Sequence, residues 1–452
     1  MLHLLLSAAL LPIVADVEAP LTVGTQLNFR GGVEARTQES DMPRKSFELT
    51  LWVLDQNDLG AELFWLVDER GRGEFPWPER FGRLRVDSYW RTTAEGPAVL
   101  YDRGEGRSAV PITLPFLAAE KPLAAGMNIK DGKDGKLDLV VDRPTKVADQ
   151  PAWHVSVRDA FGPKRTLWVN QQGPVVLRMT ENLTLGRGEP YQLQLEHLLT
   201  EKLDDTQLTA LAKTIDRLTA LRGKLNLAPR SHQIDWKAEQ LTMLREQLPG
   251  VVEIATGTPL AGLVAAAQRD LALQSGRSDA VANLSARFEG RVIEDFSTKG
   301  LAGETFNKAD LTGQVTVLHF WDYRDEPLKE PYGQVGYLDF MYHRRKAGGL
   351  QVYGVAVDGR LSEEKTRAAA ERGVRKLKSF MNLSYPVLLD SGGLIKQFGD
   401  PRLVGASLPL FVVIGPDTKI LHYHVGHYDV HQDQGLKQLD DVVAGALAKQ
   451  QK

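Results

Sequence analysis

The period of the hydrophobic pattern changes twice along the chain, and these changes limit what the chain can fold into. From about residue 21 to residue 200, apolar and polar residues alternate in short segments that Gly, Pro, Asn and Asp separate. The segments are FELTLWVLD, AELFWLVDE, RLRVDSYW, LDLVVD, AWHVSV, RTLWVN, VVLRM and YQLQLE. Alternation of this kind is typical of strands with one buried face. We therefore predict an antiparallel all-β domain over residues 20–203, built as a sandwich or as a strongly curled sheet.

A helical period follows the β pattern. In the first helical segment, apolar residues recur at three- and four-residue steps, and Asp205 or Thr206 is available as the N-cap. These apolar residues are Leu208, Leu211, Ile215, Leu218 and Leu225. The segments WKAEQLTMLREQL and LAGLVAAAQRDLAL continue the pattern. The apolar seam lasts little more than two heptads, so we predict a helical connector over residues 204–289 rather than a partner-binding coiled coil.

Strands and helices alternate from residue 290 to residue 452. VTVLHFW, LQVYGVAVD, YPVLLD, LPLFVVIG and KILHYHVG read as strands. GQVGYLDFMYHRRKA, SEEKTRAAAERGVRKLKSFM and LKQLDDVVAGALA read as helices, the second with Ser362 as its cap. This alternation predicts an α/β domain around a mixed sheet. The predicted fold class is thus multidomain, with a β domain, a helical connector and an α/β domain.

The chain of 452 residues contains no cysteine. This excludes disulfides, thiolate metal ligands and thiol nucleophiles. The formal net charge is only −3, which gives no overall field that would attract nucleic acid or an anionic membrane. We therefore expect no nucleic-acid partner.

The N-terminal residues 1–19 form a signal peptide or a hydrophobic arm. Leu4 to Ala15 make an apolar run of about 12 residues, shorter than the ~20 that a membrane-spanning helix needs. Small residues follow at Ala15 and Ala19, which resembles a secretory signal, although the segment before the run carries His3 and no Lys or Arg. We expect an exported protein, periplasmic or envelope-associated, with no membrane span in the mature chain.

Three segments carry a resemblance to a known family. They are FSTKGLAGETFNKADLTGQVTVLHFW, YPVLLDSGGLIKQFG and GASLPLFVVIGPDTKI. In their order and local pattern, residues of about 290–450 resemble the thioredoxin fold and, within it, the TlpA-like redoxins, which are thiol–disulfide oxidoreductases. In this family a W-C-x-P-C motif follows the FW strand. The resemblance aligns Pro327 with the motif proline, so Asp325 and Leu328 stand where the family has its two cysteines.

The replaced motif removes the chemistry of the family. Thiol–disulfide exchange needs a thiolate to attack a disulfide sulfur and a second thiol to release the mixed disulfide. Neither a carboxylate nor a leucine side chain does this, and no other cysteine is present. We therefore predict a protein with no catalytic residues, no cofactor and no thiol redox activity.

The resemblance also implies a groove beside a cis-proline, which matches Pro409. Such a groove holds an extended peptide through backbone hydrogen bonds, here near Leu408, and this binding needs no thiol. The residues that we expect at the groove are Trp321, Asp325, Pro327, Leu408 and Pro409. The first hypothesis is therefore a binding or scaffold protein whose partner is an extended peptide or an envelope protein.

A metal-dependent enzyme or a metal carrier is the alternative of a different class. HYHVGHYDVH carries four of the ten histidines of the chain. His422 and His424 are two apart on a strand, so both face the same side, and His427 or His431 is close enough in sequence to add a ligand. Asp325, Glu326 and Glu330 offer a second set of hard ligands. The simpler interpretation of both sets is structural. Acidic residues are favourable in the first turn of a helix. In the family that the chain resembles, the strand that matches the histidine segment faces solvent on one side and often carries polar residues.

A third hypothesis assigns an apolar ligand to the β domain, and a large apolar cavity within the curled sheet would support it. The segment EFPWPERFG adds the aromatic residues Phe75, Trp77 and Phe81. Buried sheet residues explain most aromatics of this domain, and an exposed contact ridge is the alternative for this segment.

Overall fold

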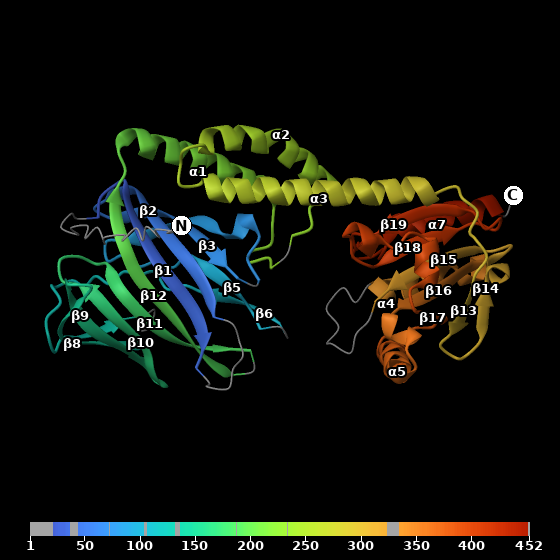
Figure 1. Cartoon of the computed structure of the whole chain (residues 1–452), viewed down its shortest axis with the longest axis horizontal. Helices are drawn as coiled ribbons and strands as arrows, with labels where there is room; N and C mark the ends of the chain where they lie inside the picture. The colour runs from blue at the N-terminus through green and yellow to red at the C-terminus, as the bar shows by residue number, and fades with distance from the viewer. Residues whose placement is uncertain are drawn as a thin grey trace, which may run out of the picture. The chain divides into compact units, whose positions relative to one another are not determined.

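The computed structural model describes residues 21–36, 44–71, 73–103, 106–131, 136–186, 188–232, 234–322 and 334–450. The chain divides into two compact units, Met1–Leu271 and Ala272–Lys452 (Figure 1). No helix in these ranges combines the length and the apolar character that crossing a bilayer requires.

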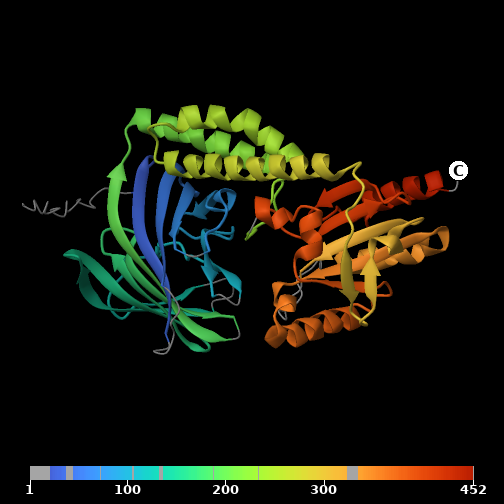
Figure 2. The ribbon, with the colours of Figure 1, turned by 45° about the vertical axis from the view of Figure 1, so that its right-hand side comes forward.

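The first unit contains a ten-stranded antiparallel sheet. In sheet order its strands are β4 (Phe81–Asp87), β3 (Gly60–Arg70), β2 (Lys45–Asn57), β1 (Thr25–Ala35), β12 (Glu189–Lys202), β11 (Val176–Leu185), β10 (Gly162–Asn170), β9 (Gln150–Asp159), β8 (Leu137–Val147) and β7 (Asn128–Asp131). A separate hairpin pairs β5 (Ala98–Asp102) with β6 (Arg107–Pro111). The long strands bend strongly, as Figure 2 shows. The prediction of an antiparallel β domain is confirmed, as a curled sheet.

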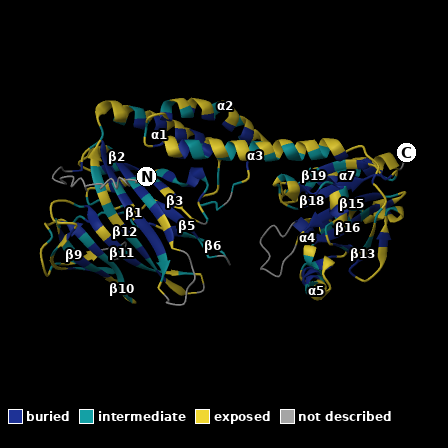
Figure 3. Ribbon diagram, in the orientation of Figure 1, coloured by how far each residue is buried: buried dark blue, intermediate teal, exposed yellow. Residues whose placement is uncertain are grey.

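The inner face of the sheet and the hairpin share one core. Leu49, Leu51 and Val53 of β2 lie in the same buried cluster as Tyr101 and Val110 of the hairpin. Alternate positions of β2 therefore face this core, as the period of two predicts. The buried positions of the strands are visible in Figure 3.

Helices cover part of the other face. They are α1 (Asp205–Leu225), α2 (Ala238–Ala255) and the first turns of α3 (Ala261–Phe288). Trp52 of β2 and Phe64 of β3 share a buried cluster with the apolar side of these helices. Phe75, Trp77 and Phe81 are only 2%, 3% and 1% exposed, so the exposed ridge is wrong and the buried interpretation is correct for this segment.

The helix caps differ from the predicted ones by one or two residues. α1 is capped by Asp204, whose side chain accepts the Gln207 N–H at 2.8 Å in a capping box, and not by Asp205 or Thr206. α5 (Glu364–Phe380) follows Glu363, and Ser362 belongs to the preceding 3-10 turn.

The second unit is an α/β domain around a seven-stranded mixed sheet. In sheet order its strands are β14 (Thr305–Asn307), β13 (Ser297–Gly300), β17 (Val387–Asp390), β16 (Leu350–Val357), β15 (Val315–Trp321), β18 (Leu410–Ile414) and β19 (Ile420–Val425). β15, β16 and β17 are parallel neighbours, whereas β18 and β19 are antiparallel. The other helices are α4 (Val335–Arg345), α6 (Gly393–Gln397) and α7 (Lys437–Gln450). This architecture confirms the α/β prediction.

Both faces of this sheet are covered, which explains why β15 lacks the buried–exposed alternation of a half-exposed strand. Val317 and Trp321 lie in the core shared with α4, α5 and α7, whereas Leu318 and Phe320 lie in the core shared with α6. All seven residues of β15 are buried. A strand with two buried faces is expected to be largely apolar, and five of the seven residues of β15 are. Thr316 and His319 are the polar exceptions, and both are fully buried.

Candidate functional site

The predicted groove of the second unit is described only in part. Asp325, Pro327 and Leu328 lie outside the described residues, and so do Glu326 and Glu330. Trp321 is 3% exposed and belongs to the core. The Leu408–Pro409 peptide bond is cis, and Leu408 is half-buried.

The sheet brings two of the five predicted groove residues to the same end of neighbouring strands. Phe320 of β15 pairs with Leu410 of β18. Because the two strands run antiparallel, Trp321 and Pro409 follow this pair at one edge of the sheet. The ligand-binding role of these residues stays a prediction.

His422 and His424 face the same side of β19, as their spacing predicts, and they pack with Tyr428. The two imidazole rings are nearly parallel, with centroids 6.3 Å apart, and the His424 ring lies 3.9 Å from the Tyr428 ring. His422 Nε2 is 2.8 Å from the Tyr428 hydroxyl. The stack therefore gives both histidines structural contacts.

The electrostatics of this stack favour neutral imidazoles. Burial lowers the pKa of His424 to about 4, and burial also lowers the pKa of His422. His427 and His431 are exposed. Within the described ranges, no group of three or more His, Asp or Glu side chains is placed to hold a metal ion. Metal binding by these histidines stays a prediction that the structure does not test.

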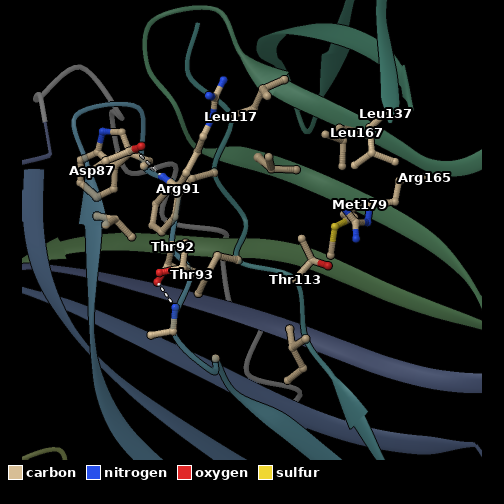
Figure 4. Close-up of a pocket in the computed structure, with 18 of the residues that line it drawn as sticks. Asp87, Arg91, Thr92, Thr93, Thr113, Leu117, Leu137, Arg165, Leu167 and Met179 are labelled. Atoms are coloured by element: carbon tan, nitrogen blue, oxygen red, sulfur yellow. Dashed lines mark hydrogen bonds between the residues drawn. The ribbon is translucent and has the colours of Figure 1, made fainter. Parts of the chain in front are cut away.

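The β domain contains a cavity of about 760 Å³. Apolar side chains from the inner face of the sheet and from residues 112–117 form much of its wall, among them Ile112, Leu117, Leu139, Val157, Leu167 and Met179. Figure 4 shows several of these side chains around the cavity. A volume of this size lies in the range of ~300–1,000 Å³ that is usual for small-molecule sites.

Arg165 interrupts the apolar wall on the inner face of the sheet, and the buried Glu181 lies behind it without lining the cavity. Arg165 of β10 lines the cavity and pairs across the strands with Glu181 of β11. Arg165 Nε is 3.0 Å from Glu181 Oε1, and the Thr113 hydroxyl donates to Glu181 Oε2 at 2.8 Å. The Glu181 side chain is only 5% exposed. The cavity thus combines a mainly apolar wall with a few polar lining residues, among them Arg165 and Thr113, which is the usual composition of a ligand site.

The sequence contains a signal for the Arg165–Glu181 pair that the motif-based prediction missed. Arg165 shares its face of β10 with the buried residues Leu167 and Val169, and Glu181 shares its face of β11 with Met179. A charged residue in the inward phase of two strands predicts a buried ion pair. That these two strands are neighbours became clear only from the sheet order.

A comparison with protein families identifies the class of the α/β unit. The AhpC/TSA family model matches residues 290–423. These residues form a redoxin domain. No curated protein matches the chain.

Solved structures resemble the part of the chain that contains the redoxin domain. A thiol:disulfide interchange protein of the thioredoxin family from Chlorobium tepidum is 19% identical, covers 35% of this chain and 97% of its own, and has a TM-score of 0.28. A secreted Mycobacterium tuberculosis disulfide oxidoreductase is 18% identical over 33% of this chain and 95% of its own, with a TM-score of 0.26. A hypothetical protein from Sinorhizobium meliloti is 17% identical, covers 36% of this chain and 85% of its own, and has a TM-score of 0.30.

The redoxin domain contains no cysteine, because the whole sequence has none. The family resemblance predicted from the sequence is therefore confirmed, together with the loss of both motif thiols. The absence of sulfur nucleophiles is compatible with a protein that has no thiol redox activity.

Proposed function

We propose that this protein is a binding protein and that its β domain holds an apolar ligand. The observation that carries this proposal is the cavity of about 760 Å³ with its largely apolar wall. Transfer of an apolar group from water into such a cavity is favourable by ~25 cal/mol per Å² of buried apolar surface. A large apolar cavity in the curled sheet is also the feature that the hypothesis of an apolar ligand requires.

Saturable binding of an apolar probe tests the proposal. We expect one long-chain fluorescent alcohol to bind per chain. The change Leu137→Trp should weaken binding by about tenfold or more, since the larger side chain fills part of the cavity that Leu137 lines. Probe fluorescence measures the affinity.

The matched control is Leu198→Trp, because Leu198 lies on the same sheet, is 41% exposed and is not among the residues that line the cavity. Its affinity should equal that of the unchanged protein. Absence of saturable binding, or equal affinities for both Trp variants, would contradict the proposal.

The redoxin domain is proposed to act as a second binding module, for an extended peptide of an exported or envelope protein. The half-buried Leu408, two residues before β18, supports this proposal, since its backbone is partly accessible to a peptide. Backbone recognition of a peptide requires no thiol. Export of the protein stays a prediction from residues 1–19.

An insulin assay separates binding from redox chemistry. We expect no dithiol-dependent reduction of insulin, since the chain supplies no thiolate, whereas the carboxymethylated B chain of insulin should be retained as an extended peptide. The change Leu408→Lys should reduce this retention. Turbidity measures reduction and a pull-down measures retention. Reduction above a buffer blank refutes the redox-inactive assignment, and equal retention by Leu408→Lys refutes the peptide site.

A further inference from the structure

The strand register places a charged pair inside an apolar row of the inner face. Leu139 pairs with Val157, Val157 pairs with Arg165, Arg165 pairs with Glu181, and Glu181 pairs with Leu193. Leu139, Val157 and Leu193 are each at most 2% exposed. Charges in such surroundings are unfavourable unless they are paired or used by a ligand.

Glu181 alone does not balance the cations around it. Arg165 Nε lies 3.0 Å from its carboxylate, and Lys164 Nζ lies 4.0 Å from it. Two positive groups thus face one carboxylate. The Arg165 Nε atom is buried and makes no hydrogen bond to any described residue, so the ion pair with Glu181 is not aligned as a hydrogen bond. A guanidinium has five N–H donors, so a cavity-lining Arg165 can bind a second anion besides Glu181.

The charges of the other residues that line the cavity also favour an anionic ligand. Among the described residues that line the cavity, Arg85, Arg91 and Arg165 are basic and Asp87 is acidic. The Arg85 side chain is 82% exposed and lies 3.7 Å from the Glu62 carboxylate. The Asp87 carboxylate is used within its own turn, where Oδ1 accepts the N–H groups of Tyr89 and Arg91, both at 2.9 Å. Figure 4 shows Arg165 beside Met179 and Leu167 in one part of the wall, and Arg91 near Asp87 in another. The wall carries more positive than negative charge, which complements an anion.

We infer that the cavity takes an anionic amphiphile, a single apolar chain that ends in a carboxylate or a phosphate, with the anionic group against Arg165. This inference rests on the proposed apolar site and adds the chemical class of its ligand. The apolar chain contacts Leu139, Val157 and Leu167, and the anion supplies a second negative charge beside Arg165. A planar guanidinium binds carboxylate and phosphate oxygens equally well in geometric terms.

Competition between three ligands with the same chain tests the inference on the full chain. Hexadecanoic acid, hexadecyl phosphate and hexadecanol each displace the bound fluorescent alcohol, and we expect at least one of the two anions to bind about tenfold more tightly than hexadecanol. The stronger of the two anions identifies the head group. Equal affinities for all three overturn the inference and leave the apolar site standing. Failure of all three to displace the probe refutes both.

A matched pair of variants locates the anion. Arg165→Gln should remove the preference for the anion over the alcohol. Arg178→Gln should keep it, because Arg178 sits on the neighbouring strand in an ion pair with Glu196 at 2.7 Å and does not line the cavity. Equal preferences in both variants place the anion elsewhere and overturn the assignment to Arg165.

A salt titration of the unchanged protein keeps the test valid if Arg165→Gln does not fold. Raising the ionic strength from about 0.05 to about 0.5 M should lower the affinity for the anion and not the affinity for hexadecanol, since salt screens charge pairing. A preference that does not change with salt refutes the charged contact.

Discussion

Replacing Lys45 with methionine is expected to lower the free energy of unfolding of the β domain by about 3–5 kcal/mol. The Lys45 ammonium lies 2.9 Å from the Glu69 carboxylate, and the two side chains are 2% and 0% exposed. Methionine fills most of the same space but removes the cation. The buried carboxylate of Glu69 then lacks the positive charge that compensates its loss of hydration.

The hydrogen bonds of this pair explain why its loss affects more than one strand. Glu69 Oε1 accepts the Phe75 N–H and Oε2 accepts the Leu100 N–H, both at 2.9 Å, and Lys45 Nζ donates to the Gly73 carbonyl at 2.9 Å. The pair thus connects β2 and β3 with the segment that leads into the buried Trp77 and with the β5–β6 hairpin. Destabilisation of this pair should therefore loosen the hairpin.

Urea denaturation of the variant, followed by tryptophan fluorescence, measures the effect. Arg70→Met is the matched control, because Arg70 pairs with Glu48 at 3.0 Å with side chains 66% and 41% exposed, and exposed pairs contribute less than about 1 kcal/mol. A loss below about 1 kcal/mol for Lys45→Met would show that the Glu69 carboxylate does not depend on Lys45.

Elements with a clear hydrophobic period could be predicted from the sequence, and those that depend on a contact could not. β1 escaped prediction because Gly31 and Gly32 interrupt its alternation. Gly31 pairs with Phe47 of β2, and a Cβ atom at Gly31 would overlap the Phe47 ring. The glycine is therefore a requirement of cross-strand packing, which only the register makes visible.

Helix starts were predicted only to within two residues, because several neighbouring polar residues can each serve as the N-cap. In α1 the sequence Asp204-x-x-Gln207 is itself a capping-box pattern, and the structure uses it in place of Asp205. The redoxin domain could be predicted because its local signatures are contiguous in the chain. The Arg165–Glu181 pair beside the cavity could not be predicted, because these two residues become neighbours only through strand pairing.

Mild acid is expected to destabilise the redoxin domain, and the buried His424 is one reason. Burial lowers the pKa of His424 to about 4, whereas an exposed imidazole titrates near 6.5. Between these values the unfolded chain binds a proton that the folded chain does not. The free energy of unfolding therefore falls as the pH drops from about 6.5 to about 4, by roughly 2–3 kcal/mol for this residue.

The change His424→Phe should flatten this pH dependence while the stack is kept. Phenylalanine retains the ring contact with Tyr428, whose centroid lies 3.9 Å away, and it removes the titrating group. His422 and His427 remain as neighbouring titratable groups, so a residual slope is expected. Because burial also lowers the pKa of His197 in the β domain to about 4, the measurement must be local.

Hydrogen exchange of the β19 amides at several pH values gives this local stability. His431→Gln serves as control, since His431 is exposed and the change should leave the pH profile as it is. If His424→Phe keeps the full slope between pH 6.5 and 4, the acid sensitivity of the redoxin domain arises from another group. If the slope disappears in both variants, the effect is not specific to His424 and the prediction is wrong.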